Sequence, residues 1–453
     1  MGETVNRIPS SGFSEILRSL VDRKKSFCLW LTAIFLAGLL LRIAALALPT
    51  PNTVSNSAAG LGTNRWKPQM PPASLEGDEL VYMALTDQLV AGKGYTLRGH
   101  PLLSRPWIVR EQYDRPLFFH PPGGIAFFLL MKRVAGTAGY ALAQAVSFAL
   151  FFWGVLLITW LITPTFNRIA FLATALLATS TPIMAHVMGR FWLDGPLLGF
   201  STAATGIFLL GIKRRKTVLV CLAGLVFGYA TLIKLTAFFA LPGVLALGWV
   251  IAPNGQRRKA IEQSAAFVFI AFTIQFPWEL WQWHVFGTAF PAWAGKPAAQ
   301  LVQNNRFVHY VTVVRSPLIY VTLLPQVIWT LIPSLLLWIV ELRQRETFRR
   351  GAALIAWIVV VLGANIVLAC LGYSKLMRYA ILVTPATVVL FGLVTSSVLE
   401  VLPNRPFFHR KNAMLISLLA VAIVGLSLEI MQGLKTSLVD NRHLNLVRPL
   451  TGL

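Results

Sequence analysis

Charged residues are scarce in this chain: they make up 13% of its 453 residues, and only 17 residues are acidic. Hydrophobic residues make up 56% of the chain, and the mean hydropathy is +0.66. This combination excludes a cytosolic enzyme. Since a bilayer-spanning helix needs about 20 apolar residues, the apolar content is sufficient for about ten or more spans. We predict an all-α polytopic membrane protein.

Other features are missing as well. The three cysteines, Cys28, Cys221 and Cys370, lie inside apolar runs and support neither a disulfide framework nor a metal site. A transmembrane barrel alternates apolar and polar residues, whereas residues 29–41 are apolar on every side. The glycine-containing segment 92–95 is too short to cradle phosphates, so a soluble nucleotide has no obvious docking site.

Eleven apolar segments are predicted to span the membrane, within a range of about 11 to 13. They cover residues 27–48, 138–162, 168–186, 195–212, 217–233, 236–251, 263–281, 318–340, 351–371, 377–399 and 412–433. Residues 122–134 are too few to cross a bilayer, so we assign them to a helix at the membrane interface.

The net charge of +23 indicates membrane orientation here rather than nucleic-acid binding. With a cytoplasmic N-terminus, all the strongly basic short loops fall on the cytoplasmic side, as the positive-inside rule requires. These loops are 213–216, 257–259, 343–350 and 405–411.

This topology divides the chain into three parts. Residues 1–26 form a cytoplasmic segment, residues 27–433 a transmembrane domain, and residues 434–453 a short outer tail. Two large loops, 49–137 and 282–317, lie on the outer side, so we expect the chemistry there.

Acidic residues are concentrated on the outer side. Asp78 and Glu79 lie at the start of a predicted surface helix. Asp194 lies in a predicted outer loop, Arg190 to Pro196. Each acid can simply cap a helix and favour its dipole. The alternative is a functional site, because isolated charges at membrane level are costly and usually functional.

Basic residues occur at outer helix ends too. Lys234 lies between two apolar runs, and Arg378 with Tyr379 follows Lys375. These cations either reach the lipid headgroups or line a site. His120 precedes a Pro-Pro pair and taken alone is more often an ordinary interfacial histidine.

The order of these motifs resembles that of the GT-C glycosyltransferases that use polyprenyl-phosphate sugars, such as protein O-mannosyltransferases and lipid A aminoarabinose transferases. The matching pieces are Gly77-Asp78-Glu79 with Tyr82, Gly92-Lys93-Gly94-Tyr95, His120-Pro121-Pro122-Gly123, Arg190 to Pro196, Lys234-Leu235-Thr236, and Lys375 to Tyr379 followed by Pro385. The resemblance implies the GT-C fold, with interfacial helices in the first outer loop.

The resemblance also implies roles for the acids. Asp78 would act as catalytic base or anchor the acceptor, Asp194 would help to build the site, and Glu79 would be a supporting acid. A divalent cation, magnesium or manganese, can bridge Asp78 and Asp194, although two acids alone do not establish a metal. Beyond this possible cation, the motifs imply no cofactor.

The remaining residues would bind substrate. The lipid phosphate leaves as an anion, so it needs charge stabilisation. Lys234 and Arg378 would supply it, with assistance from Arg190 or His120, and we place Tyr82 and Tyr379 in the same site.

The expected reaction is transfer of a sugar, with inversion, from a polyprenyl-phosphate donor to a hydroxyl on a glycolipid, polysaccharide or protein. We expect the active site on the periplasmic side of a bacterial inner membrane. Some relatives carry Lys where this chain has His120. Only about twenty residues follow the last predicted span, so we expect this chain to do without the large C-terminal outer domain that many members carry. A transporter or lipid flippase is the alternative, because intramembrane charges also line translocation routes.

Overall fold

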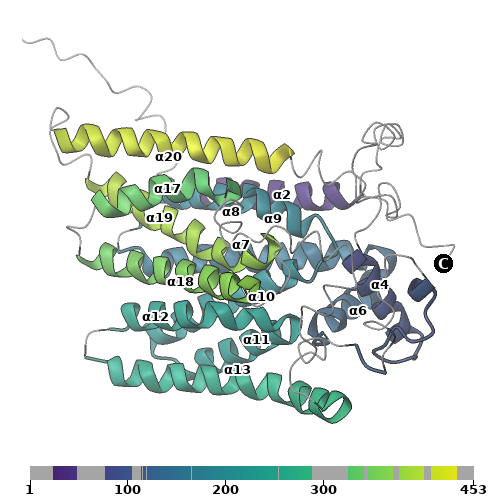
Figure 1. Ribbon diagram of the computed structural model, residues 1–453. Helices are drawn as coiled ribbons and strands as arrows, with labels where there is room; N and C mark the ends of the chain where they lie inside the picture. Colours follow the sequence, from purple (N-terminus) through teal and green to yellow (C-terminus); the bar gives the residue numbers. More distant parts are fainter. Residues whose placement is uncertain are drawn as a thin grey trace, which may run out of the picture.

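The computed structural model describes residues 24–47, 77–104, 114–253 except 115, 119 and 165, then 255–287, 325–340, 345–370, 377–401 and 410–435. Within these ranges the chain forms helices joined by turns (Figure 1). The α-helices are α2 (Lys24–Ala47), α4 (Gly77–Val90), α6 (Gly123–Ala135), α7 (Gly139–Ile162), α8 (Arg168–Ser180), α9 (Pro182–Met188), α10 (Asp194–Arg214), α11 (Thr217–Ile233), α12 (Leu241–Ile251), α13 (Arg257–Phe286), α17 (Pro325–Val340), α18 (Arg345–Cys370), α19 (Thr384–Val401) and α20 (Arg410–Lys435). Four short 3-10 helices are η1 (Pro101–Ser104), η2 (Gly136–Ala138), η3 (Leu235–Ala240) and η4 (Met377–Val383).

The predicted all-α membrane architecture is confirmed. Seven helices in the described part of the chain are long and apolar enough to cross a bilayer, and four shorter apolar helices accompany them. The number of spans and the cytoplasmic position of the N-terminus stay predictions, as do the domain boundaries. The loop 282–317 and the tail 434–453 fall mostly outside the described residues.

Proline modifies two of the predicted spans. The segment 168–186 is not one helix, because α8 ends at Ser180 and α9 begins at Pro182. Thr181 between them has φ −52° and ψ 124°, the extended conformation that a residue before proline favours. The segment 236–251 likewise starts as η3 and becomes α-helical only at Leu241, next to Pro242.

Helices α4 and α6 lie together at one end of the bundle (Figure 1). Lys132 of α6 forms an ion pair with Asp87 of α4. The 13 residues of α6 extend only about 20 Å, which is too short for a hydrocarbon core of about 30 Å. By length alone α6 does not cross the membrane, and its position at the interface stays a prediction.

The helix that carries the candidate site is held by close backbone packing. A Cβ on Gly199 of α10 would lie 2.5 Å from the carbonyl oxygen of Ser147 on α7, and a Cβ on Gly154 would lie 2.9 Å from the backbone of Thr202. Glycine at these contacts allows the two helices to approach closely, as is common in membrane bundles. The start of α10 is thereby fixed against α7.

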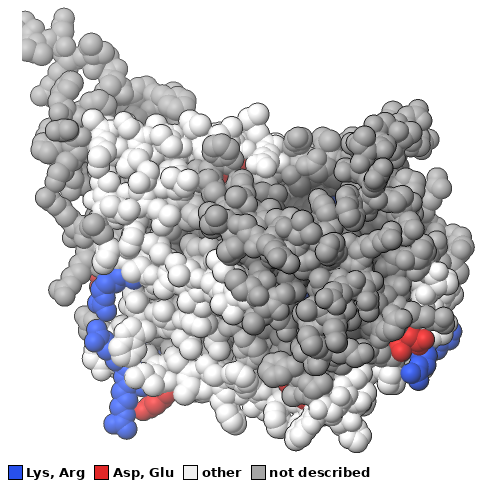
Figure 2. Space-filling view, viewed as in Figure 1, with Lys and Arg blue, Asp and Glu red and all other residues white. Residues whose placement is uncertain are grey.

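Charge separates along the bundle. In Figure 2 most of the blue Lys and Arg atoms in view lie at the end opposite α4 and α6, while the described surface between the two ends is almost uncharged. The apolar band is the part that a bilayer would cover.

Candidate functional site

The turn between α9 and α10 is supported from the core. Asp194 is the first residue of α10 and is 1% exposed, at a helix end whose free N–H groups favour an anion. The Gln144 amide of α7 donates a hydrogen bond to the Trp192 carbonyl oxygen at 3.1 Å. A Cβ on Gly195 would lie 2.2 Å from Gln144 Oε1, so any larger residue there would force this amide to move.

Lys234 pairs with Asp194. The two apolar helical segments α11 and η3 meet at Lys234, whose extended backbone has φ −152° and ψ 131°. Its Nζ lies 2.8 Å from Asp194 Oδ1, and the two side chains are 8% and 1% exposed. Lys234 therefore does not extend to the lipid headgroups, which was one reading of the sequence. The second Asp194 oxygen, Oδ2, is buried without a hydrogen-bond partner among the described residues.

Glu79 connects α4 to the same turn. Its side chain is 1% exposed, and Oε1 accepts a hydrogen bond from the Phe191 backbone N–H at 2.8 Å. The first turn of α4 therefore lies against the turn before Asp194. Asp78 precedes Glu79 and is half-buried, so it is less deeply buried than Glu79.

Arg190 lies in the same turn and is 9% exposed. Its guanidinium carbon lies 4.6 Å from the centre of the Trp192 ring, a cation–π contact. The turn thus places a cation within four residues of Asp194.

The start of α6 is inserted between the neighbours of Asp194 and Lys234. A Cβ on Gly123 would lie 2.8 Å from the carbonyl carbon of Leu232, and one on Gly124 would lie 2.4 Å from the Leu193 side chain. The Tyr229 hydroxyl donates a hydrogen bond to the Gly123 carbonyl oxygen at 2.8 Å. The Pro-Pro-Gly motif is therefore brought to the end of α11 that carries the lysine.

His120 is positioned by aromatic residues. Its ring lies 6.5 Å from that of Tyr82, which is buried, and 5.5 Å from that of Phe118. The Tyr95 hydroxyl donates to the carbonyl oxygens of His120 and Pro121, at 3.1 and 3.2 Å. Burial raises the pKa of Tyr95 well above its ordinary value, so the hydroxyl keeps its proton and remains a donor.

The last two predicted site residues are only partly described. Arg378 and Tyr379 lie in η4, but their side chains are outside the described residues, as is all of Lys375. The backbone of η4 contacts η3, α9 and α10. The element that carries the two residues therefore reaches the helices that hold Asp194 and follow Lys234.

Sequence reasoning missed two contributors. Gln144 lies in the middle of an apolar helix, and a buried amide in such a run was the available signal. Tyr95 belongs to a motif that was recognised but given no role. The contact made by Phe191 uses its backbone N–H, which no sequence pattern reveals.

A metal site is not formed by the described residues, which hold no group of three or more His, Cys, Asp or Glu side chains suited to a metal ion. One Asp194 oxygen already bonds an ammonium group, and the other is left for a further ligand. The possible cation between Asp78 and Asp194 stays a prediction.

Comparisons with known proteins agree with this geometry. The model of the dolichyl-phosphate-mannose-protein mannosyltransferase family matches residues 119–281, the stretch from the Pro-Pro motif through Asp194 and Lys234 to the end of α13. ArnT from Cupriavidus metallidurans is similar in structure, at 15% identity and a TM-score of 0.52, over 92% of this chain and 77% of that one. The chain has the GT-C fold. This result confirms the resemblance drawn from the motifs and does not favour a transporter.

A second GT-C structure is larger. The archaeal oligosaccharyltransferase AglB from Archaeoglobus fulgidus, in complex with an inhibitory peptide and a dolichol-phosphate, is 14% identical with a TM-score of 0.54. The match covers 90% of this chain but 56% of AglB, so this chain spans little more than half the length of that enzyme. A search of curated proteins finds no match.

Proposed function

We propose that this protein is a membrane glycosyltransferase that moves a sugar from a polyprenyl-phosphate donor to a hydroxyl acceptor. The observation that carries the proposal is the buried ion pair of Asp194 and Lys234 at the start of α10. Burying an ion pair is costly because desolvation opposes the Coulomb attraction, and charged residues at membrane depth are usually functional. The pair lies within the residues matched by the mannosyltransferase family model.

In the proposed reaction an acidic residue removes a proton from the acceptor, and basic residues stabilise the leaving phosphate. The acceptor oxygen attacks the anomeric carbon, the bond from that carbon to the phosphate oxygen breaks, and the acceptor proton goes to the Asp78 carboxylate. The bond electrons leave with the lipid phosphate. Lys234 and Arg190 stabilise the added negative charge, and no general acid is required. A single displacement inverts the anomeric configuration.

Asp194 and Glu79 position these groups. Asp194 Oδ1 fixes the Lys234 ammonium at 2.8 Å, and Glu79 fixes the Phe191 N–H at 2.8 Å. The donor phosphate would bind near Lys234, with Arg378, Tyr379, Tyr82 and His120 completing the site. Fixed charges in a desolvated site stabilise a transition state without reorganising.

The proposed donor and acceptor are supported by the ligands bound to a protein of similar structure. The AglB structure contains a dolichol-phosphate and an inhibitory peptide, which supports a lipid-phosphate donor and a separate acceptor for this chain. A glycolipid, a polysaccharide or a protein fits as acceptor.

We place the site on the periplasmic side of a bacterial inner membrane. Most of the Lys and Arg atoms in view in Figure 2 lie at the end of the bundle opposite α4, and basic loops favour the cytoplasm. Asp78, Glu79 and the turn before Asp194 would then face the periplasm.

The test is to incubate purified protein with a panel of polyprenyl-phosphate sugars and to measure release of the lipid phosphate. We expect release with at least one donor, and its loss in Asp194→Asn. Asp114→Asn is the matched control, because Asp114 is a partly exposed acid whose carboxylate lies 3.7 Å from Arg98. No release with any donor, or equal release by Asp194→Asn, would contradict the proposal.

A further inference from the structure

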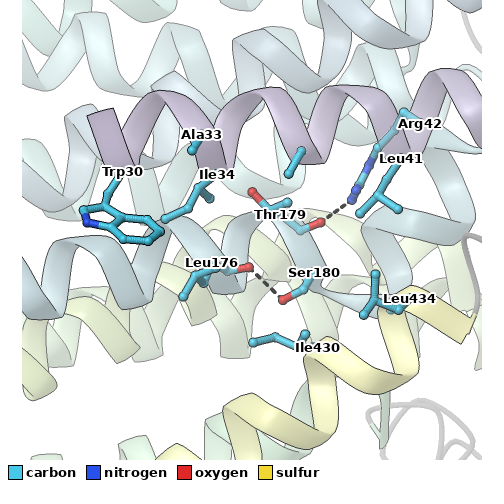
Figure 3. A pocket seen from close by; sticks show the side chains of 12 residues that line it. Trp30, Ala33, Ile34, Leu41, Arg42, Leu176, Thr179, Ser180, Ile430 and Leu434 are labelled. Carbon is cyan, nitrogen blue, oxygen red and sulfur yellow. Dashed lines mark hydrogen bonds between the residues drawn. The ribbon is translucent and has the colours of Figure 1, made fainter. Parts of the chain in front are cut away.

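An open groove lies between α2, α8 and α20 (Figure 3). It has a volume of about 320 Å³. Its walls are mainly apolar and include Trp30, Ala33 and Leu41 of α2 and Ile430 of α20. It shares no lining residue with the Asp194 site.

Among the described residues that line this groove, Arg42 is the one with a charge. Its side chain is 2% exposed, and its guanidinium carbon lies 4.8 Å from the centre of the Phe148 ring. It donates hydrogen bonds to the Thr179 carbonyl oxygen and, at 3.4 Å, to the Gly38 carbonyl oxygen. No carboxylate among the described residues forms an ion pair with Arg42, and its Nε has no hydrogen-bond partner there. The cation is therefore only partly satisfied by protein.

The surroundings of the groove are lipid-facing. Leu29, Leu36 and Leu40 of α2 are 70%, 48% and 63% exposed, as expected for a helix that contacts acyl chains. Trp30 and Arg42 are separated along α2 by about 18 Å, from a rise of about 1.5 Å per residue. That length suits an extended acyl chain, with the cation at one end.

We propose that this groove binds an anionic phospholipid of the bilayer. One acyl chain lies along α2 between Trp30 and Arg42, and the lipid phosphate accepts hydrogen bonds from the guanidinium. Guanidinium matches phosphate because its planar fork of five N–H donors can bond two oxygens at once. The phosphate supplies the negative charge that no described residue supplies.

The lipid would stabilise a helix junction. The Arg42 guanidinium holds the carbonyl of Thr179, next to the break between α8 and α9. At the same junction, a Cβ on Gly433 of α20 would lie 1.7 Å from the Ser180 carbonyl oxygen, so α20 and α8 are in direct backbone contact. A lipid in the groove would therefore join α2, α8 and α20.

Native mass spectrometry of the full chain tests the proposal. The purified protein would be mixed with phosphatidylglycerol or phosphatidylcholine in detergent, and lipid retention measured on increasing activation. We expect the wild type to retain phosphatidylglycerol in preference to phosphatidylcholine. Arg42→Gln should weaken phosphatidylglycerol binding about tenfold, equivalent to about 1.4 kcal/mol, and remove the preference.

A second variant covers the case in which Arg42→Gln fails to fold. Ala33→Trp fills the groove from its lipid side and leaves the Arg42 hydrogen bonds in place; it should also lose retention of phosphatidylglycerol. Lys25→Gln is the matched control, since it removes an exposed cation of α2 that does not line the groove, and it should bind as the wild type does. Unchanged lipid retention in Ala33→Trp, or a change of oligomeric mass in place of lipid loss, would overturn the proposal.

Discussion

Removing Lys234 should destabilise the protein more than removing any exposed lysine. The Lys234→Met side chain leaves the Asp194 carboxylate buried, 1% exposed, without its counter-ion. At 2.8 Å, the Coulomb attraction is about 6 kcal/mol for an effective dielectric constant of about 20. Desolvation offsets part of that attraction, so breaking the pair should cost about 3–5 kcal/mol.

A double-mutant cycle isolates the pair from other effects of the substitution. Asp194→Asn combined with Lys234→Met removes both charges, and the double variant should be clearly more stable than the sum of the single losses predicts. Free energies of unfolding would be measured in mixed micelles by titration with a denaturing detergent.

Lys132→Met is the matched control. Lys132 pairs with Asp87, but these side chains are 28% and 44% exposed, so the loss should be at most about 1 kcal/mol. Equal losses for Lys132→Met and Lys234→Met, or strictly additive losses in the cycle, would refute the reasoning.

Three further predictions concern residues around the site. Asp78→Asn should lower sugar transfer by about 10²–10⁴-fold with the protein still folded and inserted, and near-normal turnover would exclude Asp78 as the base. Gly195→Ala forces the Gln144 amide to move and should cost about 1–3 kcal/mol of stability, measured by the same denaturation; an unchanged value would contradict the close contact. Burial lowers the pKa of His100 from the ordinary histidine value, and its Nδ1 accepts the Leu102 N–H at 3.1 Å. The segment 97–104 should therefore lose hydrogen-exchange protection as the pH falls below about 6.5 toward that lowered pKa. His100→Gln should remove that pH dependence, and a dependence that persists would point to another group.

The sequence was sufficient to predict the fold class. Apolar runs determine where helices form in a membrane, because backbone groups in lipid must bond within the segment. The break between α8 and α9 could also have been predicted, since Pro182 stands inside the predicted span. The count of spans was harder, because short helices such as α12 fall between a core helix and a span.

The sequence predicted which residues belong to the site, but not how they contact one another. The rarity of acids and cations in the outer segments identified Asp194 and Lys234, but 40 positions separate them along the chain and no pattern indicated that they pair. The function of Glu79 as the acceptor for a backbone N–H depends on how α4 docks, which is a property of tertiary packing. The charged residues of the site could therefore be identified from the sequence, whereas the contacts between them could be found only in the structure.

An experimental structure with a non-hydrolysable polyprenyl-phosphonate sugar is the most direct test of the transfer site. The account predicts that the phosphonate binds within hydrogen-bond distance of Lys234 Nζ and that the anomeric carbon of the sugar faces Asp78. A donor bound elsewhere, with the Asp194–Lys234 pair still closed and distant from it, would contradict the account.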